Sequence, residues 1–270
     1  IVTADYPLML LDETRRETYT RLVGWLRTPE VQTRISRETT RRPVVPGARI
    51  DPAIPERVLV ELPFPASRSL LDALIDAYQA RLRRPASTYF VVDTSGSMEG
   101  EGMTQLKASL AGLAGGDASL TGRFARFQAR EQIHILPFSD PPRAPLVVRM
   151  PDDTGAGAEP LERIRQFAEA MQPGGGTAIF ASVRAAYQGA LEARRSAPER
   201  QYGIVVMSDG VNRNGMTEEA FRSWYASLPP EDQGIPVFAL LFGEADPAQL
   251  ETIARLTGGR VFDGRKNLRQ

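Results

Sequence analysis

TYFVVDTSGS, residues 88–97, decides the fold of this chain. Its first half is apolar, as is typical of a buried strand, and its second half is a short polar loop. Apolar residues then recur at helical spacing, namely Met103, Leu106, Leu110 and Leu113. The stretch therefore predicts a strand, a tight loop and a helix in immediate succession, with Asp93, Ser95 and Ser97 on the loop.

This loop offers only oxygen atoms as ligands. Asp93 carries a carboxylate, and Ser95 and Ser97 carry hydroxyls. Such a donor set suits a hard divalent cation such as Mg²⁺, Mn²⁺ or Ca²⁺, and does not suit zinc or copper. Taken alone, the same residues are also typical of a polar turn that caps a helix.

Strands and helices alternate from Thr88 onward. The patterns predict strands at residues 88–93, 132–138, 145–150, 203–208, 236–242 and 260–262. They predict helices at residues 102–114, 159–171, 178–195, 217–227 and 247–257. We therefore expect an α/β fold with a doubly wound, Rossmann-like, mostly parallel sheet flanked by helices. Such sheets bind ligands at the carboxyl ends of their strands, where the loop with Asp93 lies.

Two further loops carry polar residues at corresponding places. Residues 174–177, GGGT, precede the predicted helix at 178–195, and the glycines allow unusual backbone angles and close approach of a ligand. Thr177 adds a hydroxyl near the start of that helix. Asp209 follows the predicted strand at 203–208, so it is expected at the same sheet edge as Asp93. Alone, Thr177 would be interpreted as a helix cap and Asp209-Gly210 as a turn.

Together, Asp93-x-Ser95-x-Ser97, Thr177 after glycines and Asp209 after an apolar strand resemble the metal-ion-dependent adhesion site of von Willebrand factor A domains. The resemblance covers residues 86–265. It implies that Ser95 and Ser97 bind the cation directly and that Thr177 binds it directly or through water. It implies that Asp93 and Asp209 mainly hold waters and hydroxyls in place.

The resemblance also implies a function. With few charged ligands the cation, Mg²⁺ foremost, stays electrophilic and takes an Asp or Glu side chain of a protein partner at its open position. The chain is thus expected to be a non-enzymatic, cation-dependent protein-binding module. The alternative is a scaffold, or a solute-sensing or transport-associated component, with a merely structural metal site.

Residues 1–65 are expected to form a helical N-terminal segment, residues 66–87 a connecting helix, and residues 88–270 the α/β domain. A short strand is predicted at residues 6–11, a helix around Tyr19–Leu26, and a second helix after Thr28-Pro29. The helix at 67–83 has a wide apolar face, and we hypothesise that this face covers part of the sheet flank. Leu70, Leu74, Tyr78 and Leu82 form one row of this face, with Leu71 and Ile75 beside it.

The N-terminal segment resembles, more weakly, the last part of a bacterial extracellular solute-binding protein. The residues that carry this resemblance are 5–8, DYPL, followed by the helices around Trp25-Leu26 and residues 29–32, PEVQ. Only Lys107 and Lys266 are lysines, a bias towards Arg that is typical of GC-rich bacterial genomes. A bacterial, extracytoplasmic protein is therefore expected, although most of a two-lobed solute binder is absent from these residues.

Composition and motifs disfavour other classes. The formal net charge is +0, which favours neither nucleic acid nor a membrane surface. There is no cysteine and no apolar stretch long enough to span a bilayer. The chain lacks a P-loop and a G-x-S-x-G elbow. A metal-assisted hydrolase would need a base, and the single histidine, His134, lies in a strand pattern typical of a sheet-face or core residue.

Overall fold

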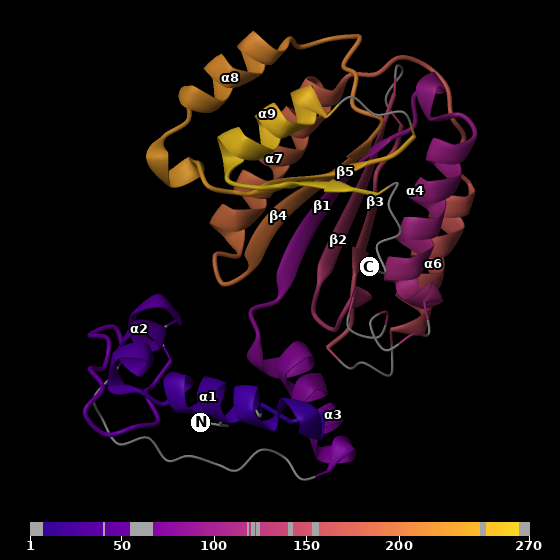
Figure 1. The fold of residues 1–270 in the computed structure, drawn as a ribbon. Coiled ribbons are helices and arrows are strands. Elements are labelled where there is room, and N and C mark those ends of the chain that lie inside the picture. Colours follow the sequence, from indigo (N-terminus) through magenta and orange to yellow (C-terminus); the bar gives the residue numbers. More distant parts are fainter. Residues whose placement is uncertain are drawn as a thin grey trace. The chain divides into compact units, whose positions relative to one another are not determined.

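The computed structural model describes residues 8–39, 41–54, 67–117, 119, 122, 125–139, 143–152, 157–243 and 247–264. The chain forms two compact units, Ile1–Asp72 and Ala73–Gln270 (Figure 1). No helix within these described ranges is long and apolar enough to cross a membrane.

The N-terminal unit contains the two predicted helices, α1 (Arg16–Leu26) and α2 (Pro29–Thr39), after a short 3-10 turn at Glu13–Arg15. Thr28 starts α2 as expected, because its carbonyl accepts from Gln32 N and its hydroxyl accepts weakly from Val31 N. The strand predicted at 6–11 is wrong for residues 8–11, which are not in a strand. Residues 6 and 7, and most of the DYPL stretch, lie outside the described residues.

The predicted helix at 67–83 is present as α3 (Arg68–Ala77), which continues into a wider helical turn at Tyr78–Leu82. Our hypothesis that its apolar row covers the sheet is wrong. Leu70, Leu74 and Tyr78 are all exposed, by 51%, 44% and 57%. An apolar stripe indicates that a helix has a face to bury, but it does not say which surface covers that face.

All six predicted strands are present. They are β1 (Ala86–Asp93), β2 (Gln132–Phe138), β3 (Leu146–Arg149), β4 (Gln201–Ser208), β5 (Val237–Leu241) and β6 (Val261–Asp263). They form one sheet in the order β3-β2-β1-β4-β5-β6, in which only β3 is antiparallel to its neighbour. The prediction of a mostly parallel, doubly wound sheet is confirmed.

Helices cover both faces of this sheet (Figure 1). They are α4 (Glu101–Ala111), α6 (Ala158–Glu169), α7 (Ile179–Ser196), α8 (Glu218–Ala226) and α9 (Ala248–Thr257). On one face, α4 and α6 pack through Leu106 and Ile164 against Phe90 and Val92 of β1. The other face packs against α7, α8 and α9. Alternate residues of β1 thus enter two separate cores, as the two-residue period of a strand requires.

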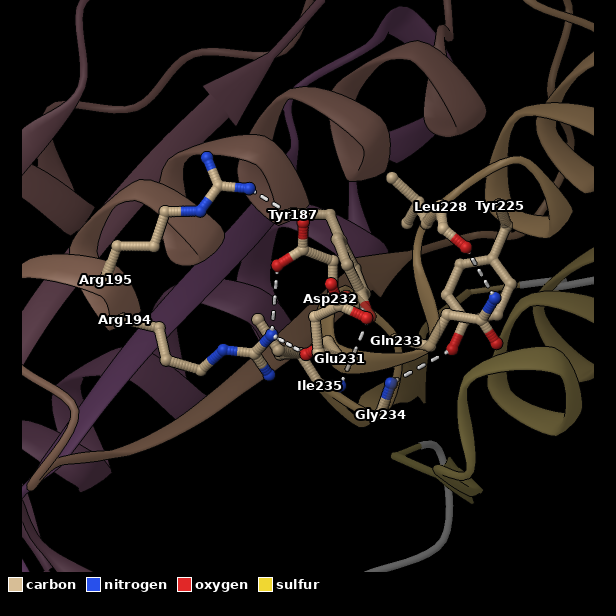
Figure 2. Close-up of polar contacts among 10 residues, drawn as sticks. All are labelled: Tyr187, Arg194, Arg195, Tyr225, Leu228, Glu231, Asp232, Gln233, Gly234 and Ile235. Carbon is tan, nitrogen blue, oxygen red and sulfur yellow. Dashed lines mark hydrogen bonds and ion pairs between the residues drawn. The ribbon is translucent and has the colours of Figure 1, made fainter.

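A polar cluster fastens the connection between α8 and β5 to α7 (Figure 2). The hydroxyl of Tyr187 donates to the carbonyl of Asp232 at 3.1 Å and accepts from the backbone N–H of Ile235 at 3.2 Å. The carboxylate of Asp232 also pairs with Arg195 at 2.7 Å. These contacts lie just before β5 begins, so they fix the amino end of that strand.

The order of the strands places the site. From β1 the chain adds β2 and β3 on one side and then β4, β5 and β6 on the other. The topological switch point is therefore between β1 and β4, and ligands bind outside the carboxyl ends of these strands. Asp93 is the last residue of β1, and Asp209 directly follows β4.

Candidate metal centre

Asp93 is completely buried and held by two hydrogen bonds. Its Oδ1 accepts from the backbone N–H of Ser95 at 2.9 Å, and its Oδ2 accepts from the hydroxyl of Ser208 at 2.5 Å. The first bond closes the tight loop after β1, and the second joins the ends of β1 and β4. The carboxylate is therefore a fixed acceptor at the switch point.

Burial raises the pKa of the Asp93 carboxyl to about 6, and the negative charge of Asp209 adds to this effect. The hydrogen bonds from Ser208 and Ser95 lower the pKa but do not offset the loss of solvent. A buried carboxylate with a second carboxylate nearby is costly without a positive charge. The electrostatics of this pair therefore favour a cation.

The two serine hydroxyls lie next to each other. Ser95 Oγ and Ser97 Oγ are 3.1 Å apart, and Ser95 is the N-cap of the short helical turn, Gly96–Met98, that contains Ser97. Ser95 is buried, whereas Ser97 is exposed. The alternative that this loop caps the next helix does not hold, because α4 begins later, with Gly100 as its N-cap and no side-chain cap.

The glycine loop is bonded directly to the Asp93 loop. Gly174 N donates to Thr94 O at 2.9 Å, and Gly96 N donates to Gly175 O at 3.1 Å. Gly175 has a φ of +82°, in the left-handed region that favours glycine. These two bonds draw the loop before α7 against the loop after β1, although the residues are far apart in sequence.

Thr177 is buried at the end of the glycine loop, and its hydroxyl makes no hydrogen bond with the described residues. The alternative interpretation of Thr177 as a helix cap does not hold, because the N-cap of α7 is Ala178, without a side-chain cap. The carbonyl of Thr177 accepts from Arg213 N at 2.9 Å and from Asn214 N at 3.0 Å. The loop after β4 is therefore joined to the glycine loop.

Asp209 opens this third loop, and its Oδ1 is buried without a hydrogen-bond partner in the described part of the chain. Ser208 Oγ accepts from Gly210 N at 3.0 Å, which shapes the turn. Buried carboxylate oxygens are normally satisfied by a donor or a cation. The lone oxygen of Asp209 and the uncommitted hydroxyl of Thr177 are thus free to act as ligands.

The structure brings all five sequence-predicted residues to one sheet edge through three loops that hydrogen-bond to one another. Sequence reasoning gave no role to Ser208, which links the strands of both carboxylates. Its position at a strand end was the only available signal. It also gave no role to Arg213, whose backbone meets Thr177.

His134 lies away from this edge. It pairs with Tyr89 between β1 and β2, and the two rings stack with centroids 4.0 Å apart and planes 6° apart. Burial lowers the pKa of its imidazole to about 4. Tyr89 is six positions before Ser95 in the chain. His134, which lies beside Tyr89 in the sheet, therefore does not form a Ser-His pair with Ser95.

Several solved structures are similar to this chain at low identity. Proximal thread matrix protein 1 from the mussel byssus is 16% identical, covering 67% of this chain and 45% of its own, with a TM-score of 0.44. The manganese-loaded TRAP protein of Plasmodium vivax is 15% identical over 68% and 70%, with a TM-score of 0.45. The pilus adhesin SpaC from Lactobacillus rhamnosus GG is 15% identical over 67% and 29%, with a TM-score of 0.46. Similarities this low carry no argument about function.

Comparison with curated proteins gave no significant match. The von Willebrand factor type A domain family, in contrast, matches residues 88–267. This range contains the whole sheet from Thr88 onward and all three loops of the site, and it agrees with the resemblance inferred from the motifs. The chain belongs to the von Willebrand factor type A domain family.

Proposed function

We propose that this chain is a non-enzymatic module that binds a protein partner through a divalent cation. The observation that supports this most is that Oδ1 of Asp209 is buried without a hydrogen-bond partner among the described residues. Loops that hydrogen-bond to one another bring it together with the hydroxyl of Thr177 and with the hydroxyls of Ser95 and Ser97, which bond to each other. A protein interior leaves polar atoms without partners only rarely. An all-oxygen group of this kind fits Mg²⁺ best, and also Mn²⁺ or Ca²⁺.

In this proposal Ser95, Ser97 and Thr177 offer neutral ligands, while Asp93 and Asp209 supply the negative charge. Asp93 does not contact the cation directly in this proposal, since both of its oxygens already accept hydrogen bonds. When bound, the cation supplies an electrophilic centre that attracts a carboxylate. Asp93 uses its two carboxylate oxygens to orient the Ser95 backbone and the Ser208 hydroxyl, which keeps the loops in register.

The partner would reach the site from the side of Ser97. Ser95 and Thr177 are buried, whereas Ser97 and the neighbouring Gly175 are exposed. An Asp or Glu side chain is narrow enough to enter beside these two residues, and its charge complements the cation. We propose a protein presenting such a side chain, in an extracytoplasmic setting, and neither nucleic acid nor a membrane as the partner.

Calorimetric titration with MgCl₂, MnCl₂ and CaCl₂ tests the proposal. The Ser97→Ala variant should lose at least about tenfold in cation affinity, because it removes the exposed hydroxyl of the site. Ser109→Ala removes a hydroxyl from α4 that only bonds the Gln105 carbonyl, and it should bind like the wild type. Equal cation binding by both variants would refute the proposed ligand set.

The burial of the site residues favours a second function, in which the metal site is only structural. Asp93, Ser95 and Thr177 are all fully or almost fully buried, as in a site that only stabilises the fold. A scaffold or solute-sensing protein would then need the cation for stability alone. Pull-down from the source organism with and without EDTA separates the two, provided thermal unfolding is measured in parallel. Lower stability with unchanged partner capture would establish the structural role.

A further inference from the structure

Arg213 lies next to the candidate site, and its positive charge has no partner among the residues that the structure describes. Arg213 is exposed, and its guanidinium makes no ion pair or hydrogen bond with the residues that the structure describes. Its backbone N–H donates to the carbonyl of Thr177 at 2.9 Å. A free cationic side chain is therefore anchored one hydrogen bond away from a proposed cation ligand.

The loop that carries Arg213 is held firmly. Asn214 N donates to the same Thr177 carbonyl at 3.0 Å, and Asn212 N donates to the Gln249 side chain of α9 at 2.7 Å. A Cβ on Gly215 would lie 3.7 Å from the Cβ atoms of Ala178 and Ala181, so the loop also contacts the start of α7. With the residues before and after it fixed, Arg213 has a defined place beside the site.

Charge at the rim is unevenly distributed. Glu99 and Glu101, both exposed, lie at the start of α4, on one face of the sheet. Arg213 precedes α8, which covers the other face (Figure 1). A partner segment that crosses the site thus meets two carboxylates on the α4 side. On the other side it meets the guanidinium of Arg213 together with the acidic first turn of α8, where Glu218 is paired with Arg222. This asymmetry favours one orientation of an acidic segment over the reverse.

We propose that Arg213 is a specificity residue that binds a second carboxylate of the partner. The inference rests on the proposed function: one acidic side chain reaches the cation, and a second, nearby in the partner, pairs with the guanidinium. Arginine suits this role because its planar fork bonds both oxygens of a carboxylate. The preferred partner is therefore a protein segment with two neighbouring acidic residues, and not one with a single acid.

Short synthetic peptides with one central Glu, and a panel in which a second Glu is moved through the flanking positions, test this idea. Binding to the full chain is measured by fluorescence anisotropy in MgCl₂ or MnCl₂ and again in EDTA. The wild type should bind at least one two-acid peptide about tenfold more tightly than the one-acid peptide, a gain expected of one charge-assisted pair. Arg213→Ala should abolish this preference and leave one-acid binding within about twofold of wild type.

Two further variants sharpen the result. Arg213→Lys keeps the charge and loses the fork, so it should retain only part of the preference. Arg149→Ala removes an exposed arginine opposite Gln132, at the other end of the sheet, and should retain all of it. Cation-dependent binding with a preference that survives in Arg213→Ala, or with no preference in the wild type, overturns this inference alone. Absence of cation-dependent binding of every peptide overturns the proposed function as well.

Discussion

Asp93 is the residue at which stability and the proposed binding oppose each other. Its ionised carboxylate is buried beside Asp209, and burial raises its pKa to about 6, so the charge costs folding free energy at neutral pH. In Asp93→Asn that charge is absent while the shape is kept. We expect the variant, in EDTA, to be more stable than wild type by about 1–3 kcal/mol, and to lose at least about tenfold in Mg²⁺ affinity.

Urea unfolding in EDTA and calorimetric titration with MgCl₂ measure the two effects of this substitution. The exposed Asp76 on α3 provides the control, because Asp76→Asn should change stability by less than about 0.5 kcal/mol and leave the affinity unchanged. A variant of Asp93 that loses stability in EDTA and keeps its affinity for Mg²⁺ would contradict both parts of the argument.

His134 should make the chain less stable in mild acid. Burial lowers the pKa of its imidazole to about 4, below the ordinary value of 6.5. Below pH 6.5 the unfolded chain therefore binds a proton at His134 that the folded chain does not bind. The free energy of unfolding then falls as the pH falls towards 4. Allowing for partial exposure, we expect His134 to account for about 1 kcal/mol of lost stability between pH 7 and pH 5.

The variant His134→Phe isolates this effect, because a ring can still stack on Tyr89 while every other group titrates as before. Chemical unfolding of both proteins at pH 7 and pH 5 gives the comparison. The loss of stability on acidification should be smaller in the variant by about 1 kcal/mol. Identical losses in the two proteins would show that His134 takes up its proton equally well in the folded chain.

At the scale of elements, the sequence predicted the strands well because apolar runs bounded by polar turns are a strong local signal. The sequence pattern predicts that β1 begins at Thr88, two residues after its start at Ala86 in the structure. Ala86 and Ser87 are small and do not extend the apolar run, and they belong to the strand because they pair with Gln201 and Tyr202 of β4 and, for Ser87, also with β2. Pairing between distant segments has no local signature, so such ends are not predictable from pattern alone.

The same limit applies to the site. The sequence predicts a site of Asp93, Ser95, Ser97, Thr177 and Asp209 because together they resemble a family motif, with each part next to a strongly patterned element. The hydrogen bond between Ser208 and Asp93 could not be predicted, since it joins residues 115 positions apart. The apolar row of α3 led to a wrong prediction for the opposite reason: its pattern was clear, but the pattern contains no information about the surface that a helix contacts.

The element with the clearest structural role outside the site is α7. Tyr187 is fully buried, and its hydroxyl both donates to Asp232 O and accepts from Ile235 N (Figure 2). Tyr187→Phe would leave the buried N–H of Ile235 and the partly buried carbonyl of Asp232 without this partner, which costs about 1–3 kcal/mol. We expect that loss in urea unfolding, with cation affinity unchanged, because the cluster lies at the amino end of β5 and the site lies at the carboxyl ends of β1 and β4.

The solvent-exposed pair of Arg163 and Glu159 on α6 gives a matched control for this substitution. Its charged atoms are 3.8 Å apart and both side chains are at least half exposed, so Glu159→Ala should change stability by less than about 0.5 kcal/mol. If Tyr187→Phe were equally mild, the hydrogen bonds of the cluster would contribute nothing measurable to the fold. If it weakened cation binding, the two ends of the sheet would be coupled.

At the scale of the whole molecule, the family match and the compact units suggest different starting points for an independent domain. The match begins at residue 88, whereas the C-terminal unit begins at Ala73. The residues between them include Arg83, whose guanidinium pairs with Glu131 in a mostly buried ion pair. They also include Arg84, which donates to the carbonyls of Pro198 and Glu199 at 2.7 and 2.8 Å. Removing them would leave Glu131 buried without its partner, which is strongly destabilising.

We therefore expect a fragment of residues 73–270 to fold alone, with a Tm within about 3 °C of the full chain and the same affinity for Mg²⁺. A fragment of residues 88–270 should be less stable than the longer fragment by about 2–4 kcal/mol, since it lacks Arg83 and Arg84. Thermal and urea unfolding of both fragments, with titration of MgCl₂, makes the comparison. Restoring only residues 83–87 to the shorter fragment should recover most of the loss, and a fragment of 88–270 as stable as 73–270 would show that the two arginines are dispensable. Loss of cation binding from the 73–270 fragment would instead give the N-terminal unit a part in the site.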